Sequence, residues 1–243
     1  MSSPVAVTAG YALRACLPPR RRLGLILPAA GAVLFGLVAH AVTADSARDA
    51  FALVVSSGIF GIVVPIACLV AGDAVLGAEV RAGTLPFTWL SPVPRWTIVV
   101  GRWLAGTAVA VVVLGVACAL AAVVAGVPGD APALVLSVAV SAAAYVALFV
   151  MLGAVSRRAV VWSLAVVVLG EVLLGAALDG IAQLSPGWLG RAGFAGLTGA
   201  TDLMRDGVPQ GWAAVARAVF VTVACLAVAA WRLAHVRLAG VSD

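Results

Sequence analysis

The sequence predicts an all-α protein that crosses a membrane six times, with both termini in the cytoplasm. Of its 243 residues, 64% are hydrophobic and only 10% are charged, and the mean hydropathy is +1.17. A soluble domain carries about 25% charged residues, so this composition excludes a soluble protein. Apolar runs of about 20 residues, the length that crosses a bilayer as a helix, follow one another along the chain.

The segment before the first apolar run predicts a short helix in the inner membrane interface. Its apolar residues recur at helical spacing from residue 5 to residue 17, where Pro18 and Pro19 end the pattern. A frayed terminus is the alternative. Arginines 20–22, the apolar run after them and Ala39-His40-Ala41 are also typical of a cleaved secretory signal. The run is longer than the about 7 to 15 residues of such signals, and further runs follow, so we expect a retained first helix.

Six apolar runs predict six spans, which occupy residues 23–42, 51–74, 98–124, 133–155, 159–178 and 213–231. Short connections make neighbouring helices antiparallel. The segment 179–212 is too long for a structureless loop and holds two short apolar patches, so it predicts a re-entrant or interfacial pair of short helices. Nothing in the sequence separates a second domain. We expect one transmembrane domain over residues 1–243.

The distribution of arginine predicts the orientation. Eleven arginines fall on the side of the termini, namely Arg14, Arg20, Arg21, Arg22, Arg81, Arg95, Arg102, Arg157, Arg158, Arg232 and Arg237. The other side holds four, Arg48, Arg191, Arg205 and Arg217. Cytoplasmic connections carry the excess of basic residues, so both termini are predicted to be cytoplasmic. This rule also accounts for the net charge of +5, and we expect no nucleic-acid partner.

Residue types that are scarce exclude several functions. All 15 basic residues are arginine, so the chain lacks the lysine of a phosphate-binding loop and cannot hydrolyse ATP by that route. The four cysteines and two histidines are too far apart for a zinc site or a disulfide framework. We therefore expect no catalytic residue, metal or cofactor in this chain. An intramembrane enzyme, the alternative, would need several catalytic groups at one depth.

The connection between the second and third runs is chemically unlike its surroundings. It reads AEVRAGTLPFTWLSPVPRW over residues 78–96 and contains an acid, two arginines, a Gly-Thr pair and three prolines. A short helix that ends near Gly83 and Thr84 is expected there, and the prolines fix the remainder into turns. The orientation makes residues 75–97 a compact cytoplasmic loop. The alternative is an ordinary turn whose charges keep it hydrated.

This loop resembles the cytoplasmic signature of ABC type-2 transporter permeases. That signature is E-x-x-x-G-T-L, a Leu-Ser or Ser-x-Pro-Val turn, and a Gly-Lys or Gly-Arg that opens the third helix. The matching residues here are Glu79, Gly83, Thr84, Leu85, Leu90, Ser91, Pro92, Val93, Arg95, Gly101 and Arg102. Pro86 and Phe87 depart from the commoner Glu-Leu or Leu-Leu. Six spans, an N-terminal interfacial helix and a helical external segment also match the family's architecture.

The resemblance implies a permease subunit of a bacterial ABC exporter in the plasma membrane. It implies a homodimer or heterodimer of permeases that docks two copies of an ATPase subunit, and the ATPase binds ATP and Mg. The residues implied to couple to the ATPase are Glu79, Arg81, Gly83, Thr84, Leu85, Pro92 and Arg95. The cargo implied is hydrophobic or amphipathic, such as a lipid, a drug or an antibiotic-like compound. A non-transporting scaffold or immunity protein of the same family is the alternative.

Polar residues inside the apolar runs are candidates for the translocation path. Glu171 lies in the fifth run, where an ionisable group costs about 2.5 kcal/mol or more unless it is paired or hydrated. A hydrogen bond to a neighbouring helix explains it equally well. Tyr145, Ser56 and Ser57 are weaker candidates. Interhelical hydrogen bonds are the more common role of such residues, and of Ser137 and Ser141.

Two further residues of the second run carry structural predictions. Pro65 lies in the middle of the run and is expected to kink the helix, because it removes one backbone hydrogen bond. Asp73 lies at the inner end of the run, where it can pair with Arg102 of the third run.

Overall fold

The computed structural model describes residues 4–16, 18–41, 46–77, 93–156, 159–167, 169, 183–200 and 209–235. Every element in these ranges is a helix, which confirms the all-α prediction for the described part of the chain. The elements are α1 (Pro4–Cys16), α2 (Pro19–Ala41), α3 (Ala47–Val54), η1 (Val55–Val63), α4 (Val64–Gly72), η2 (Asp73–Gly77), α7 (Arg95–Val124), η3 (Pro128–Asp130), α8 (Ala131–Val155), α9 (Ala159–Ala165), α12 (Pro186–Thr198) and α13 (Trp212–His235).

Five stretches of helix are long and apolar enough to cross a membrane. They are Arg22–Ala41, Ala47–Val75, Arg95–Val124, Pro128–Val155 and Trp212–His235, and they coincide with five of the six predicted runs. The remaining run, predicted at 159–178, begins as expected with α9 at Ala159. Residues 168 and 170–182 lie outside the described ranges, so the sixth span and the orientation stay predictions.

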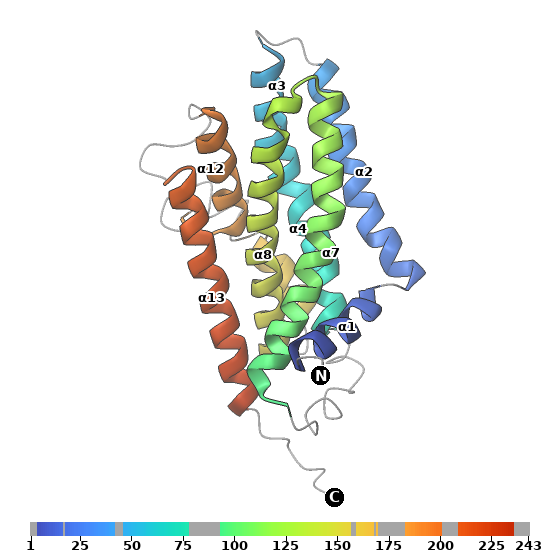
Figure 1. Cartoon of the computed structure of the whole chain (residues 1–243), viewed down its shortest axis with the longest axis vertical. Coiled ribbons are helices and arrows are strands. Elements are labelled where there is room, and N and C mark those ends of the chain that lie inside the picture. Colours follow the sequence, from blue (N-terminus) through green and yellow to red (C-terminus); the bar gives the residue numbers. More distant parts are fainter. Residues whose placement is uncertain are drawn as a thin grey trace, which may run out of the picture.

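The helices form an elongated bundle with α1 and the C-terminal end of α13 at the same end (Figure 1). We call this the basal end, and the opposite end, where α2 leads to α3 and α7 leads to α8, the far end. α8 lies between α7 and α13 (Figure 1). Two helices are too short to cross the bundle. α1 lies across the basal part of α7, and α12 packs on α8 and α13 toward the far end.

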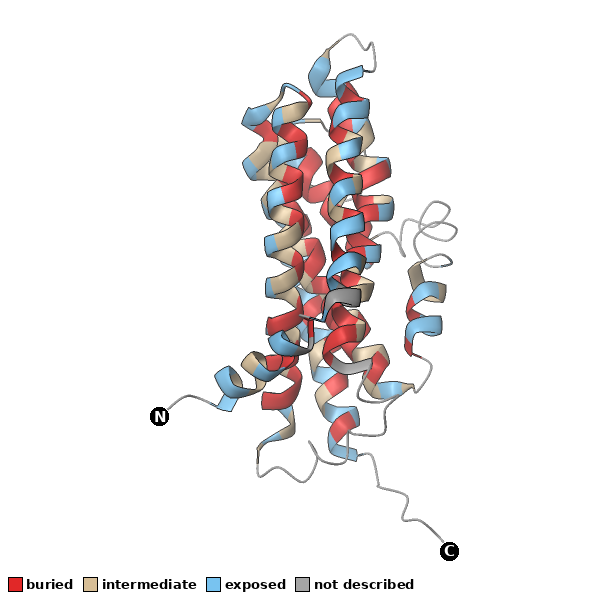
Figure 2. Cartoon of the chain, turned by 90° about the vertical axis from the view of Figure 1, so that its right-hand side faces the viewer, coloured by how far each residue is buried: buried red, intermediate tan, exposed pale blue. Residues whose placement is uncertain are grey.

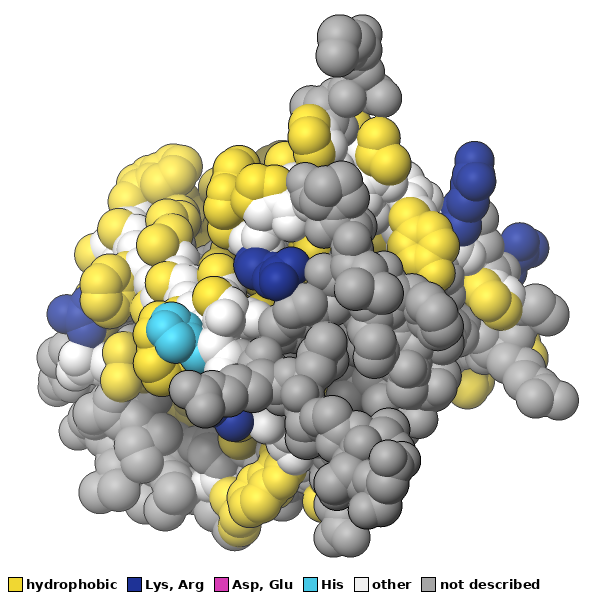
Figure 3. Space-filling view, turned by 90° about the horizontal axis from the view of Figure 1, so that it is seen from below, with side chains coloured by type: hydrophobic (Ala, Val, Ile, Leu, Met, Phe, Trp, Pro, Cys, Tyr) yellow, Lys and Arg dark blue, Asp and Glu magenta, His cyan; other side chains and the backbone are white. Residues whose placement is uncertain are grey.

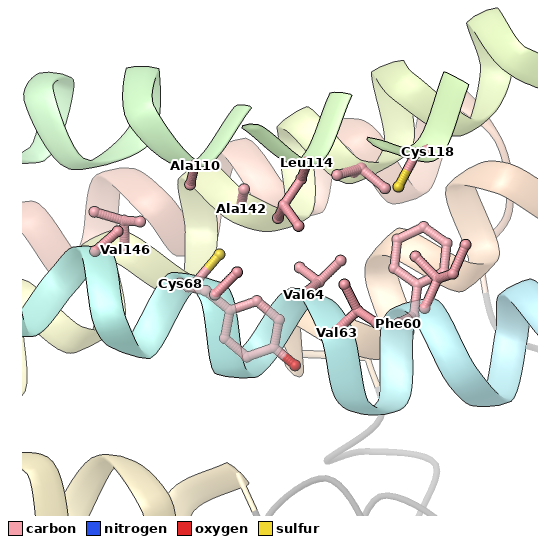
Figure 4. Packing of buried hydrophobic residues seen from close by; sticks show 14 of the residues in the cluster. Phe60, Val63, Val64, Cys68, Ala110, Leu114, Cys118, Ala142 and Val146 are labelled. Atoms are coloured by element: carbon pink, nitrogen blue, oxygen red, sulfur yellow. The ribbon is translucent and has the colours of Figure 1, made fainter. Parts of the chain in front are cut away.

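The bundle buries many alanines together with a few large side chains, and its outer surface exposes large apolar side chains. In Figure 4, Phe60, Val64 and Cys68 face Leu114 and other residues of α7 and α8 in the core. Buried positions form the inner side of each helix in Figure 2, whereas the outer surface carries exposed side chains such as Leu27 (71% exposed) and Phe220 (69%). Exposed apolar side chains over the length of the helices are what a lipid-facing surface requires.

The backbones of α2 and α7 lie against each other where the two helices meet, without large side chains between them. A Cβ atom at Gly36 would lie 2.6 Å from the backbone oxygen of Ala121, so only glycine fits at this contact. Lipid tails are as apolar as protein side chains and give helices no hydrophobic reason to associate. Dispersion contacts between closely spaced backbones hold such helices together instead.

Pro65 changes the hydrogen-bond pattern of the second span over a long stretch. The preceding segment η1 has π-helical geometry, in which Val64 N donates to Ile59 O, five residues earlier. Proline has no N–H, and its ring crowds the carbonyl four residues before it, which is that of Gly61. Widening the turn relieves this crowding and redirects the neighbouring bonds. The structure thus shows a change of helical hydrogen-bond register before Pro65, and the predicted kink stays a prediction.

A bidentate ion pair joins two connections at the far end. Arg48 Nε and Nη2 donate to Asp130 Oδ2 and Oδ1 at 2.9 and 2.7 Å. Arg48 lies in the first turn of α3, and Asp130 is the buried N-cap residue of α8. Paired hydrogen bonds between a guanidinium and a carboxylate fix geometry as well as charge. The pair therefore holds the start of the second span against the start of the fourth.

We expect Arg48→Ala to lower the thermal midpoint of the detergent-solubilised protein more than Asp130→Asn does. Arg48→Ala leaves a buried carboxylate without its countercharge, whereas Asp130→Asn leaves the exposed Arg48 guanidinium in water. The double variant should lose less than the sum of the two single losses. Equal, additive losses in a double-mutant cycle would show that the two side chains do not stabilise each other.

Candidate functional site

The predicted coupling loop connects two helices that pack together at the basal end. η2 ends at Gly77, and α7 begins at Arg95 after its N-cap residue Pro94. Arg95 is partly exposed in the first turn of α7. Residues 78–92 lie outside the described ranges, and with them the other predicted coupling residues, Glu79, Arg81, Gly83, Thr84, Leu85 and Pro92. Their role stays a prediction.

A buried arginine joins the helices on the two sides of this loop. Arg102 of α7 is 2% exposed, and its Nη1 donates to the carbonyl oxygen of Val75 in η2 at 2.9 Å. The last carbonyls of a helix have no partner further along the helix and carry its partial negative charge. The guanidinium of Arg102 donates a hydrogen bond to such a carbonyl, and its positive charge balances the partial negative charge of the helix end. Arg102 therefore clamps the end of the second span to the start of the third.

The N-terminal helix crosses α7 at the residue before this clamp. A side chain at Gly101 would collide with Thr8 Oγ1 of α1, so the glycine makes the crossing possible. Thr8 Oγ1 donates to Val5 O of its own helix at 2.9 Å, and Thr97 O of α7 is a second, longer acceptor at 3.4 Å. α1 buries Ala12 and Cys16 and exposes Val7 and Tyr11. The helix predicted before the first run is thus present. In the Gly-Arg pair of the motif, Gly101 makes room for α1 and Arg102 binds the end of the second span.

Exposed arginines lie on the described basal surface. Arg14, Arg22 and Arg232 are exposed there. Figure 3 views this end and shows arginines (dark blue) among hydrophobic side chains (yellow), with no acidic side chain of the described residues visible on this face. Arg95 stands in the first turn of a helix, where a cation opposes the helix dipole.

The structure does not bring the predicted path residues together in the described part of the chain. Tyr145 is fully buried in α8 and stacks on Phe149 with a centroid distance of 5.7 Å. Ser56 and Ser57 donate to Leu53 O of their own helix at 3.0 and 2.9 Å. Glu171 lies outside the described residues. A role for these four in translocation remains a prediction.

The two serines of α8 that face α12 behave differently from each other. Ser141 Oγ donates to Pro186 O at the start of α12 at 2.9 Å, which confirms an interhelical hydrogen bond. Ser137 Oγ is enclosed beside Gly193 and has no hydrogen-bond partner among the described residues, so that prediction was wrong for this serine. Ser141 holds the first turn of α12 beside the middle of α8.

Two features escaped the sequence-based site assignment. The bond from Arg102 to the carbonyl oxygen of Val75 was not predicted, although the sequence placed Arg102 where it can pair with Asp73, two residues before Val75. An apolar groove between α7, α8 and α13 is lined by none of the predicted path residues that the structure describes, Tyr145, Ser56 and Ser57. Alanines four residues apart on α8, Ala139 and Ala143, form part of it.

Comparison with known proteins identifies the family. A family model described as ABC-2 family transporter protein matches residues 26–236, most of the 243-residue chain. A search of curated proteins found no match. The matched region runs from α2 to the last residues of α13 and includes both helices joined by the Arg102 clamp. The family that the 78–102 motif predicts is thereby confirmed, and the chain belongs to the ABC-2 family of transporter proteins.

Proposed function

We propose that the chain is the transmembrane subunit of a bacterial ABC exporter in the plasma membrane, with the basal end in the cytoplasm. Membership of the family implies a multi-pass membrane protein that works with an ABC ATPase. The arginines of the basal surface support the orientation, because basic residues concentrate on the cytoplasmic side. The cargo is hydrophobic or amphipathic and moves outward.

The observation that carries this proposal is the Arg102 clamp. The loop 78–92 connects two helices that Arg102 fastens together through Val75 O. A force applied to the loop by a soluble partner then acts on the second and third spans as one unit. A loop that only reversed the chain would not need a buried guanidinium, which is costly to desolvate unless it is hydrogen-bonded.

Charged residues of the loop and of the first turn of α7 bind the ATPase. Glu79 and Arg81 belong to the loop, and Arg95 stands just beyond it. Complementary charges on the ATPase surface pair with these residues. Two permeases and two ATPases form the working assembly. α1, packed on α7 at Gly101, lies in the membrane interface beside the docking site.

Reporter fusions test the orientation. A reporter placed after Asp243 should be cytoplasmic, and one inserted within 126–131 should be external, because α7 and α8 meet at the far end of the bundle. A chain with its C-terminus displayed outside would contradict the cytoplasmic placement of the 78–92 loop.

Glu79→Ala and Gly83→Val should weaken co-purification of the ATPase while the permease remains in the membrane. The first substitution removes a charge from the grip, and the second disturbs the predicted end of the loop helix. Arg232→Ala, an exposed basal arginine outside the loop, is the control. Full ATPase binding and full transport by both loop variants in reconstituted vesicles would make the loop an ordinary hydrated turn.

Arg102→Gln should separate ATPase binding from coupling. The shorter side chain lengthens or breaks the bond to Val75 O, and an unsatisfied buried carbonyl costs about 1–3 kcal/mol of stability. We expect the ATPase to co-purify normally while hydrolysis stimulated by the permease falls. Arg22→Gln, the same substitution at an exposed position, should change neither measurement. Normal stimulation by a folded Arg102→Gln protein would show that the clamp does not transmit force.

A further inference from the structure

The guanidinium of Arg191 lies beside the middle of the second span. A β-carbon built at Gly61 of η1 would lie 3.1 Å from Nη2 of Arg191, which belongs to α12. Gly61 is the central residue of the 29-residue stretch Ala47–Val75. At the rise of an α-helix, about 20 Å of helix therefore separates Gly61 from either end of the stretch. In a bundle embedded in a membrane, this cation lies near mid-depth.

α12 reaches this depth because it begins in the middle of the bundle. Ser141 Oγ, near the middle of α8, donates to Pro186 O in the first turn of α12 at 2.9 Å. Gly190 lets α12 approach the second span closely, since a β-carbon there would lie 2.5 Å from Phe60 Cε1. Arg191 follows directly in the chain. The sequence alone assigned Arg191 to the external segment, whereas the structure places its guanidinium beside the second span.

Two contacts orient the guanidinium, and neither of them carries a negative charge. Its Cζ lies 5.0 Å from the centroid of the Trp188 ring, which belongs to the same helix. The absence of a side chain at Gly61 leaves the room that Nη2 occupies. Arg191 and Trp188 are both half-buried, so a ligand can reach the pair from outside the core. A cation inside a membrane is costly and marks a substrate path or an ion pair.

We propose that Arg191 binds the anionic group of the exported compound, a carboxylate or a phosphate, so that the cargo is an anionic amphipath. A guanidinium presents a planar fork of donors that fits both groups, and stacking on Trp188 orients it. The attraction is stronger at this depth than in water, because the surroundings screen charge weakly. A cationic cargo is repelled at the same point. The inference rests on the proposed export function and adds the charge of the cargo.

Binding of probes that share one alkyl chain and differ in head group tests the site. The full-length permease is reconstituted without an ATPase in phosphatidylcholine nanodiscs, and empty nanodiscs are the blank. Radiolabelled dodecanoate and dodecyl phosphate should bind more tightly than dodecylamine and dodecanol. Arg191→Gln should lower the affinity for both anions about tenfold, because hydrogen bonds to a charged group are lost, and should leave that for dodecanol unchanged. Arg217→Gln, the same substitution at an exposed arginine of α13, is the matched control.

Gly61→Ala keeps the charge but moves the guanidinium, so it should lower anion affinity and gives a second test if Arg191→Gln does not fold. Its control is Gly31→Ala, whose β-carbon would meet Val63 at an ordinary 3.7 Å. Tighter binding of dodecanoate indicates a carboxylate cargo, tighter binding of dodecyl phosphate indicates a phosphate cargo, and either order supports the proposal. Equal wild-type affinity for the anions and dodecanol would overturn it. Unchanged anion affinity in the folded variants would likewise make Arg191 a structural residue.

The assay separates this inference from the function on which it rests. It requires neither an ATPase nor transport, so a loss of anion selectivity overturns the inference and leaves the export proposal standing. A permease that binds both anions through Arg191 but supports no ATP-dependent export would instead overturn the proposed function, and with it the identification of the anion as cargo.

Discussion

Backbone hydrogen bonding in a medium without water is the constraint on which this structure depends. Each span must satisfy its own N–H and C=O groups, so an apolar run of sufficient length becomes a helix whatever its side chains. Side chains then decide only how helices associate. At Gly36 and Ala121 the association is backbone against backbone, and at Gly72 the β-carbon of Phe149 fills the space that a side chain would take. The stability of the bundle therefore rests on the absence of bulk at particular positions.

Three polar contacts of the described residues each fix one relation between elements. Arg102 relates the second span to the third, Ser141 relates α8 to α12, and the Arg48–Asp130 pair relates the two connections of the far end. Each contact ends on a backbone carbonyl or on an opposite charge, as burial requires. Such contacts set the register of helices that apolar packing alone would leave free to slide.

The spans could be predicted from the sequence because hydrophobicity and length are sufficient for them. The predicted runs 98–124 and 133–155 differ from α7 and α8 by no more than three residues at either end. The faces of these helices could not be predicted. α7 and α8 are apolar on all sides, so no periodic pattern distinguishes the side that packs from the side that meets lipid. The partner of Arg102 and the groove over Ala139 both depend on that missing information, as does the missing partner of Ser137.

The crossing of α1 and α7 has a consequence for biosynthesis. Thr8 and its acceptor Thr97 are 89 residues apart, and Gly101 must be in place before the N-terminal helix can settle on it. At about 5–20 residues per second, a ribosome needs roughly 4 to 18 s to make that length of chain. During this interval α1 has been synthesised but its docking surface has not. α1 therefore reaches its place late, after the third span has been made and has entered the membrane.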